Sequence, residues 1–110
     1  GLDKRIGGKF LHPGPGYGGS CFPKDTLALV RTGQDHACDI SIVDQVVSYN
    51  AERKASMAGR VERAAGGAVD GKTIAVLGLA FKPETDDMRD SPSLDIIPCI
   101  VGGWCAYSRL

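Results

Sequence analysis

The chain has 110 residues, of which 43% are hydrophobic and 24% are charged, and its 13 basic residues equal its 13 acidic residues. A chain of this length corresponds to one domain, and balanced charge without a basic run gives no indication of a nucleic-acid partner or an anionic membrane. No apolar run approaches the roughly 20 residues of a membrane-spanning helix, and the spacing of the cysteines and histidines does not indicate a metal site.

The first 23 residues are rich in glycine and proline, a composition typical of a loop. A short helix is expected from Lys24 to about Thr32, because Pro23 suits a first helical turn. Gly33 is expected to end it.

A much longer helix is expected over Ile42–Ala65. Ser41 is its candidate N-cap, and Gly66 with Gly67 supplies the end. The residues of its helical stripe recur at spacings of three and four: Ile42, Val43, Val46, Val47, Asn50, Ala51, Met57, Ala58 and Val61. A helix this long in so short a chain favours a bridge between domains or a dimer interface.

The run from Thr73 to Leu79 is apolar and β-branched, which predicts a buried strand of a parallel sheet. A polar loop over residues 80–91 follows, and a further helix begins at Pro92. Strand, loop and helix in this order open a doubly wound domain. The predicted fold class is therefore α/β: a loop and a long central helix over residues 1–70, then over residues 71–110 the start of a doubly wound, Rossmann-like parallel sheet.

The stretch "GPGYGGSCFPKD" contains the letters of a dinucleotide-binding fingerprint in Gly14, Gly16 and Gly19. That fingerprint follows a strand and opens a helix. Here the preceding "KFLHP" is too short for a strand, and Pro23 prevents a helix from continuing back to the third glycine. The chain therefore contains no NAD fingerprint.

The same stretch has a second interpretation, as a glycine-lined approach to a reactive cysteine. Glycines permit close approach of a ligand to the backbone. Cys21 precedes a helix N-terminus and Lys24 adds a positive charge, and both effects lower the pKa of a thiol. Asp25, one helical turn on, is placed to exchange protons. The alternative is a buried structural cysteine.

Two segments, "GPGYGGSCFPKDTLAL" and "KTIAVLGLAFKPETDDMRDSPSLDIIP", together resemble the nucleotide-sugar 6-dehydrogenase family, and the resemblance extends to about Pro98. The family oxidises the primary alcohol of a nucleotide sugar twice to a uronic acid. The resemblance implies NAD as cofactor, and it implies a UDP-sugar substrate with conversion of UDP-glucose to UDP-glucuronate. GDP-mannose or another nucleotide sugar remains the alternative substrate. A homodimer or higher oligomer and a cytoplasmic location are also implied.

The resemblance also implies roles for individual residues. Cys21 attacks the intermediate aldehyde to give a thiohemiacetal, oxidation of this adduct gives a thioester, and water hydrolyses the thioester. Asp25 assists proton transfer and activates the water. Lys24 lies close to the cofactor phosphates, and Arg89 approaches the cofactor across a domain cleft.

The substrate-binding residues follow from the same resemblance. They line the sugar and uridine pocket or contact the substrate: Arg5, Phe10, Leu11, Gly14, Gly16, Tyr17, Gly18, Gly19, Phe22, Phe81 and Lys82. Within this set, Arg5 reaches the substrate phosphates of the neighbouring subunit. Phe81 and Lys82 lie at the carboxyl end of the predicted strand.

Two features depart from the family. We expect this chain to be a fragment without the family's N-terminal NAD-binding Rossmann domain, and the residues after Pro98 no longer match, so the chain alone is expected not to turn over substrate. Cys38, Cys99 and Cys105 are expected to be small apolar fillers, with the thiols reduced. A helical dimerisation module without chemistry of its own is the alternative function.

Overall fold

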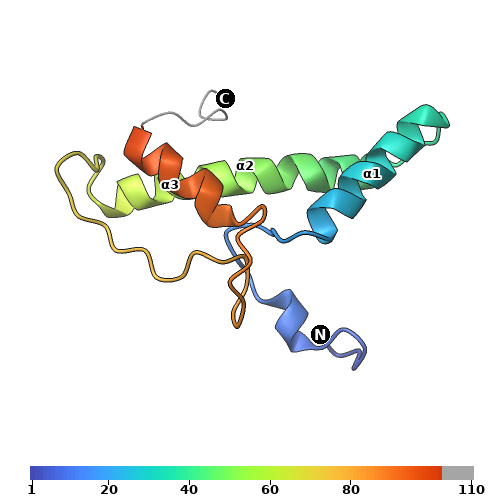
Figure 1. The fold of residues 1–110 in the computed structure, drawn as a ribbon, viewed down its shortest axis with the longest axis horizontal. Coiled ribbons are helices and arrows are strands. Elements are labelled where there is room, and N and C mark those ends of the chain that lie inside the picture. The colour runs from blue at the N-terminus through green and yellow to red at the C-terminus, as the bar shows by residue number, and fades with distance from the viewer. Residues whose placement is uncertain (103–110) are drawn as a thin grey trace.

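The computed structural model describes residues 1–102, apart from the side chain of Phe10. These residues form a 3-10 helix, η1 (Gly8–Leu11), and three α-helices, α1 (Phe22–Asp35), α2 (Ser41–Ala64) and α3 (Pro92–Gly102). Figure 1 shows α2 as the long axis of the molecule, with α1 packed on its first half and α3 on its second. The segments that precede α1 and α3 therefore meet near the middle of α2.

The bounds predicted for the long helix are confirmed to within one residue at each end. Its N-cap is Ile40, however, and no side chain caps it there, so the prediction of Ser41 as N-cap is wrong. Ser41 is already helical, and its N–H donates to the Asp39 carboxylate at 2.9 Å. The aspartate therefore satisfies one of the N–H groups that the start of a helix leaves without a partner.

The C-terminus of α2 closes at Gly66 and Gly67 as predicted. Gly66 has φ 92° and its N–H donates to the Arg63 carbonyl at 3.1 Å, while the Gly67 N–H donates to the Glu62 carbonyl at 2.8 Å. This pair of bonds is a Schellman motif, in which the first residue past the cap takes a left-handed conformation. Glycine fills this left-handed position because it adopts a positive φ without steric strain.

The short helix is longer than predicted at both ends, and Gly33 does not end it. A Cβ on Gly33 would lie 2.6 Å from Cγ1 of Ile40, so the glycine lets α1 pack closely against the turn before α2. The helix ends instead in a second Schellman motif with Ala37 at the left-handed position, φ 50°. The Cys38 N–H donates to the Gly33 carbonyl at 2.9 Å, and the Ala37 N–H to the Gln34 carbonyl at 3.3 Å.

Ala37→Gly is expected to stabilise the protein by about 0.5–1 kcal/mol, because alanine is strained at a left-handed φ. Relief of this strain exceeds the cost of the larger conformational entropy that glycine gives the unfolded chain. Gly66→Ala is the matched control at the other Schellman motif and is expected to destabilise by a similar amount. A Cβ there meets nothing closer than 3.8 Å, so only φ opposes it. Urea midpoints measure both changes, and a lower midpoint for Ala37→Gly would contradict the assignment.

The strand predicted over Thr73–Leu79 is not present, and residues 1–102 contain no β-strand. A strand forms only when a neighbouring extended segment accepts its backbone hydrogen bonds, and within the described residues none lies beside it. The segment is extended and exposed, with Leu77 95% accessible. Its last carbonyl, that of Leu79, accepts hydrogen bonds from the hydroxyls of Ser91 and Ser93 at 2.5 and 2.6 Å.

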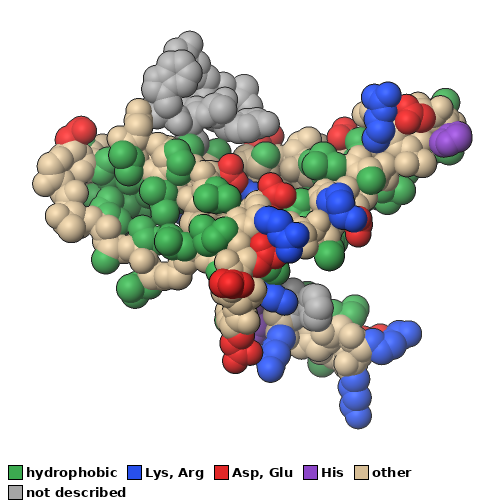
Figure 2. All heavy atoms as spheres, in the orientation of Figure 1, with side chains coloured by type: hydrophobic (Ala, Val, Ile, Leu, Met, Phe, Trp, Pro, Cys, Tyr) green, Lys and Arg blue, Asp and Glu red, His purple; other side chains and the backbone are tan. Residues whose placement is uncertain are grey.

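A groove of about 790 Å³ separates this extended segment from α3. Apolar side chains line it from both sides, including those of Ile74, Val76, Ile96 and Ile97. Figure 2 shows hydrophobic side chains gathered on this part of the molecular surface. The apolar residues for which a strand was predicted thus line one side of this groove, and apolar side chains of α3 line the other.

The third helix begins at Pro92, as predicted, and contains Pro98 in its interior. No helix of residues 1–102 is both long and apolar enough to cross a membrane. The predicted departure from the family after Pro98 falls mostly on residues 103–110, which lie outside the described part of the chain.

Candidate active site

The glycine-rich loop before Cys21 is held by one face of α2. The Tyr17 N–H donates to Oδ1 of Asn50 at 2.8 Å, and Nδ2 of Asn50 donates to the Tyr17 carbonyl at 3.1 Å. One turn along the helix, the Arg53 guanidinium donates twice to the Gly14 carbonyl, at 3.1 and 2.9 Å. The loop is therefore fixed by side chains although it has no regular backbone structure.

A second loop, residues 81–91, packs against the same glycines. The Gly19 N–H donates to the Arg89 carbonyl at 2.8 Å. A Cβ on Gly18 would lie 2.8 Å from the Asp90 carbonyl carbon, and one on Gly19 would lie 2.8 Å from the Phe81 ring. Both glycines thus allow contacts within the chain itself.

Lys54 connects α2 to α3 and to the second loop. Its side chain is buried, and Nζ lies 2.9 Å from the Asp95 carboxylate and 3.1 Å from the Asp90 carbonyl. A Cβ on Gly16 would lie 2.7 Å from Cγ of this lysine. Lys54 is therefore surrounded by both loops, and its charge is paired.

Cys21 lies at the N-cap of α1 and is exposed. The Asp25 N–H donates to the Cys21 carbonyl at 2.9 Å, which places the two residues one helical turn apart, as predicted. Lys24 Nζ pairs with the Asp25 carboxylate at 2.9 Å, and both side chains are mostly exposed. A nucleophile, a carboxylate and a cation thus share the first turn of one helix.

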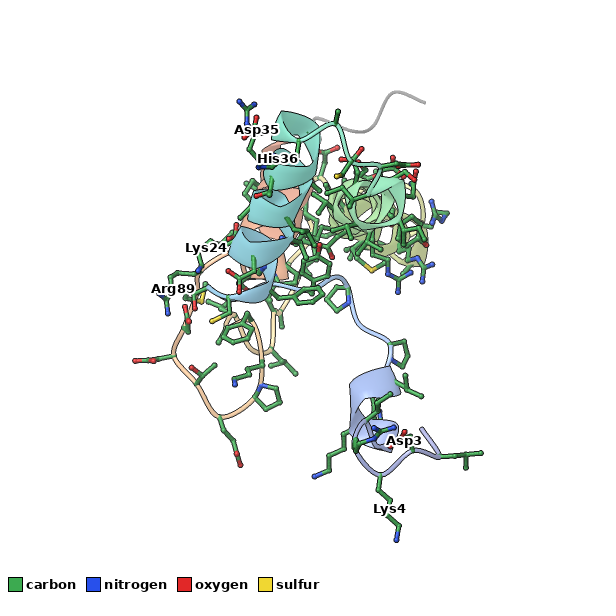
Figure 3. The ribbon with its side chains drawn as sticks, turned by 90° about the vertical axis from the view of Figure 1, so that its right-hand side faces the viewer. Asp3, Lys4, Lys24, Asp35, His36 and Arg89 are labelled. Atoms are coloured by element: carbon green, nitrogen blue, oxygen red, sulfur yellow. The ribbon has the colours of Figure 1, made fainter. Side chains whose placement is uncertain are left out.

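Two cations lie near the Cys21 sulfur, one from each segment. The hydrogen bond and charge of Asp25 raise the pKa of Lys24, and the negative charge of a Cys21 thiolate adds to this. The pKa of Arg89 is raised chiefly by its bond to Asp87, again with a contribution from Cys21. Figure 3 shows Lys24 and Arg89 beside each other, far from Asp3 and Lys4. The structure therefore brings Cys21, Asp25, Lys24 and Arg89 together.

Arg89 is oriented by Asp87 through two parallel bonds, from Nε at 3.0 Å and Nη2 at 2.8 Å, and by a backbone bond at 2.9 Å. These bonds from Arg89 lower the pKa of Asp87 to about 2 from its ordinary 3.8. The pairing is therefore complete above the ordinary value and is lost as the pH falls through about 2.

We expect the Asp87 carboxyl to titrate near pH 2 when its carbon resonance is followed by NMR. Arg89→Gln removes the guanidinium and is expected to move the midpoint up toward 3.8. An unsubstituted chain whose Asp87 midpoint lies at the ordinary value would show that the two bonds to Arg89 do not form in solution.

Aromatic residues named for the substrate lie on both sides of the glycines. The Tyr17 and Phe22 rings meet edge to face, with centroids 4.7 Å apart and an interplanar angle of 84°. Lys82 Nζ lies 5.3 Å from the centroid of the Phe81 ring, a cation–π contact. Phe22 and Lys82 are exposed, whereas Tyr17 and Phe81 are half-buried.

The N-terminal candidates are not brought to Cys21. Arg5 lies on the exposed arm before η1, where its guanidinium pairs with Asp3 at 2.7 Å. Figure 3 places Asp3 at the far end of this arm from Lys24. Leu11 is exposed at the end of η1, and the Phe10 side chain lies outside the described part of the structure.

The cysteines correct one expectation. Cys21 and Cys38 are free and exposed, whereas Cys99 is disulfide-bonded, so the prediction of reduced thiols fails at Cys99. Cys38 is too exposed for the filler role expected of it, and Cys105 lies outside the described residues. Within residues 1–102, no group of three or more His, Cys, Asp or Glu side chains is arranged to hold a metal ion.

Sequence reasoning missed Asn50, Lys54 and Asp95 as site residues. Asn50 lies in the helical stripe predicted for the long helix, and a lone amide among apolar residues is the signal that points to it. The burial of Lys54 had no signal in the sequence, because its partners lie 36 or more positions further along the chain.

Two domain models of one protein family match the sequence of this chain. Residues 1–52 match the central domain of the UDP-glucose/GDP-mannose dehydrogenase family, and residues 75–101 match its UDP-binding domain. The chain belongs to the UDP-glucose/GDP-mannose dehydrogenase family. The first match contains Cys21 and Asn50, and the second contains Phe81 and Arg89, so both loops of the site lie within this family's domains.

Relatives in the UDP-glucose/GDP-mannose dehydrogenase family match nearly the whole chain. The UDP-glucose 6-dehydrogenase of Rhizobium meliloti is 60% identical over 100 residues, which are 91% of this chain and 23% of that protein. UDP-glucose 6-dehydrogenase TuaD of Bacillus subtilis is 46% identical over 100 residues, 91% of this chain and 22% of that protein. The structure of a UDP-glucose dehydrogenase from Pyrobaculum islandicum superposes with a TM-score of 0.72 at 42% identity and covers 92% of this chain and 23% of the other. The chain thus spans less than a quarter of these relatives.

Proposed function

We propose that this chain carries the catalytic-cysteine segment of an NAD-dependent UDP-glucose 6-dehydrogenase, which oxidises UDP-glucose to UDP-glucuronate. The observation that carries the proposal is the exposed Cys21 at the start of α1, with Asp25 one turn away and the cations Lys24 and Arg89 beside it. The names of the relatives support UDP-glucose as the substrate. GDP-mannose remains the alternative, since the family name includes it.

The proposed chemistry begins with an aldehyde produced from the sugar's primary alcohol. The Cys21 thiolate adds to the aldehyde carbon, and the carbonyl electron pair moves to the oxygen. The resulting oxyanion is stabilised by a nearby cation or takes a proton, which it gives up again when the adduct is oxidised. Loss of the carbon-bound hydrogen with its electron pair gives a thioester. Water then adds, the carbon–sulfur bond breaks, and Cys21 leaves as the thiolate while Asp25 takes the proton of the water.

NAD, when bound, supplies the acceptor for the hydrogen and electron pair removed in each of the two oxidations. The residues present fit its diphosphate, because Lys24 and Arg89 are exposed cations contributed by two segments and lie beside each other in Figure 3. Their role in the chain's own chemistry is to attract anions and to stabilise negative charge at the sulfur and at the oxygen of its adduct.

The proposed substrate site lies over the two loops. Tyr17 and Phe22 offer aromatic surface, Phe81 packs against Gly19 with Lys82 over its ring, and a Cβ on Gly14 would meet open space. Gly16 acts by letting its loop approach α2, and Gly18 and Gly19 act by letting the two loops approach each other. The N-terminal arm completes the set with Arg5, Phe10 and Leu11, and we propose that Arg5 serves the site of a partner subunit.

We further propose that residues 1–70 and residues 71–110 belong to two domains. Residues 73–79 form no strand within residues 1–102, and we propose that they join a doubly wound sheet only where further strands are present to pair with them. Their exposed apolar side chains support this, because such a run is suited to a sheet buried on both faces. A homodimer is supported by the exposed apolar side chains of Ile42, Val46 and Tyr49, which share one face of α2. We propose a cytoplasmic location, because the proposed function is the oxidation of a nucleotide sugar.

A chimera tests the proposed function. The 100 matching residues of the Rhizobium meliloti enzyme are replaced by those of this chain, and NADH formation is measured with UDP-glucose and with GDP-mannose. We expect NADH from UDP-glucose, two per sugar oxidised, and the unmodified relative is the control. A folded chimera that reduces NAD with neither sugar would refute the proposal, and one that prefers GDP-mannose would refute the substrate.

A further inference from the structure

One face of α2 holds both loops of the site at positions one turn apart. Asn50 binds the backbone of Tyr17 through a donor and an acceptor, the arrangement that a neighbouring strand would offer. Lys54 binds the carbonyl of Asp90 and pairs with Asp95 at the start of α3. A single helix therefore sets where two segments that lie far apart in the sequence stand relative to each other.

The groups held in this way are the immediate neighbours of the reactive ones. Tyr17 precedes Cys21 by four residues and Asp90 directly follows Arg89. The loops also join each other, since the Gly19 N–H donates to the Arg89 carbonyl at 2.8 Å. A shift of either loop along α2 therefore changes the distance between the sulfur and the guanidinium.

The backbone at Asp90 shows that this placement needs support. Asp90 has φ 48°, a left-handed conformation that costs a residue with a side chain free energy. Such a conformation persists where surrounding contacts hold it. The bond from Lys54 to the Asp90 carbonyl is one such contact, and the close approach of Gly18 is another.

We propose that Asn50 and Lys54 are positioning residues, which place Arg89 beside Cys21 by holding Tyr17 and Asp90 on the same face of α2. The inference rests on the proposed function only in taking Cys21 as the nucleophile. The placement itself is a property of this chain, and it is testable without NAD or a sugar nucleotide.

The test compares the rates at which Cys21 reacts with iodoacetate and with iodoacetamide. Iodoacetate is an anion and iodoacetamide is neutral, so the ratio of the two rates reports positive charge near the sulfur and is insensitive to general access. Charges within about 10 Å act on one another at 0.1 M salt, and one unit charge at such a distance changes the ratio by roughly two-fold. Mass spectrometry separates Cys21 from Cys38, which serves as the internal reference, and the chain in concentrated urea gives the baseline.

We expect the native ratio at Cys21 to exceed the urea baseline, and we expect Arg89→Gln to lower it by roughly two-fold. Lys54→Met and Asn50→Leu are expected to lower it similarly, although Asn50 is uncharged and the charge of Lys54 is paired with Asp95. Arg60→Met is the matched control: it removes one positive charge from an exposed position of the same helix and is expected to leave the ratio unchanged.

A cooperative urea transition shows that each variant folds, and where Lys54→Met does not fold, Asp95→Asn takes its place by removing the lysine's partner from a half-exposed position. Folded Lys54 and Asn50 variants with the native ratio would overturn the proposal, as would a native ratio equal to the urea baseline. A chimera that fails with both sugars while these ratios still fall would refute the proposed function and leave the positioning role supported.

Discussion

Cys21→Ser is expected to lower uronic acid formation in the chimera at least about 1,000-fold, because a serine hydroxyl is scarcely ionised near neutral pH and removal of an activated nucleophile costs at least this much. The first oxidation, from alcohol to aldehyde, needs no sulfur. The variant is therefore expected to release about one NADH per sugar and to accumulate aldehyde. NADH counted against uronic acid by mass spectrometry measures both effects.

Cys38→Ser is the matched control for this substitution, since Cys38 is also free and exposed but lies beyond the other end of α1. It is expected to retain two NADH per sugar. Uronic acid formed by the Cys21→Ser chimera at the unsubstituted rate would remove the cysteine from the reaction, and with it the covalent mechanism.

Gly18→Ala is expected to destabilise the protein by about 1–3 kcal/mol, the usual cost of forcing an extra methyl group into closely packed structure. The new Cβ would lie 2.8 Å from the Asp90 carbonyl carbon and 3.1 Å from Cα of Ser91. Both contacts involve backbone, which cannot rotate out of the way as a long side chain can. The second loop must therefore move as a unit, and Arg89 must move with it.

Gly14→Ala in the same loop is the control for this effect. Nothing lies within 4 Å of a Cβ at Gly14, so the substitution is expected to change stability by less than about 0.5 kcal/mol. Urea unfolding measures both variants. Equal midpoints for Gly18→Ala and the unsubstituted chain would show that the two loops do not approach each other as closely as the structure has them.

The helices were predictable where local chemistry decides them. The apolar stripe and the Gly66–Gly67 pair located α2 to within one residue, because helix periodicity and a left-handed cap are both properties of neighbouring residues. The end of α1 was not predictable in this way. Glycine commonly ends a helix, but Gly33 lies inside α1, because the close approach of Ile40 leaves no room for a Cβ at this position.

The prediction of a strand was wrong for a different reason. An apolar, β-branched run such as Thr73–Leu79 predicts that a segment is suited to a sheet, but a ladder also needs a partner, and no property of the run itself supplies one. The site was predictable in part. Cys21 and Asp25 are placed by α1, as its N-cap and within its first turn. Arg89 is 68 positions away from Cys21 in the printed sequence, and only the contacts of the folded chain bring it close.

The position of α2 between the two loops in the chain has a consequence for how the protein folds. Tyr17 and Asn50 are 33 positions apart, and Lys54 and Asp90 are 36 apart. A direct encounter of the two loops would close about twice that length of chain, and the entropy of closure grows with length. Each loop instead docks separately on a helix that forms within about a microsecond. We therefore expect α2 to act as the folding template on which the surroundings of Cys21 assemble in either order.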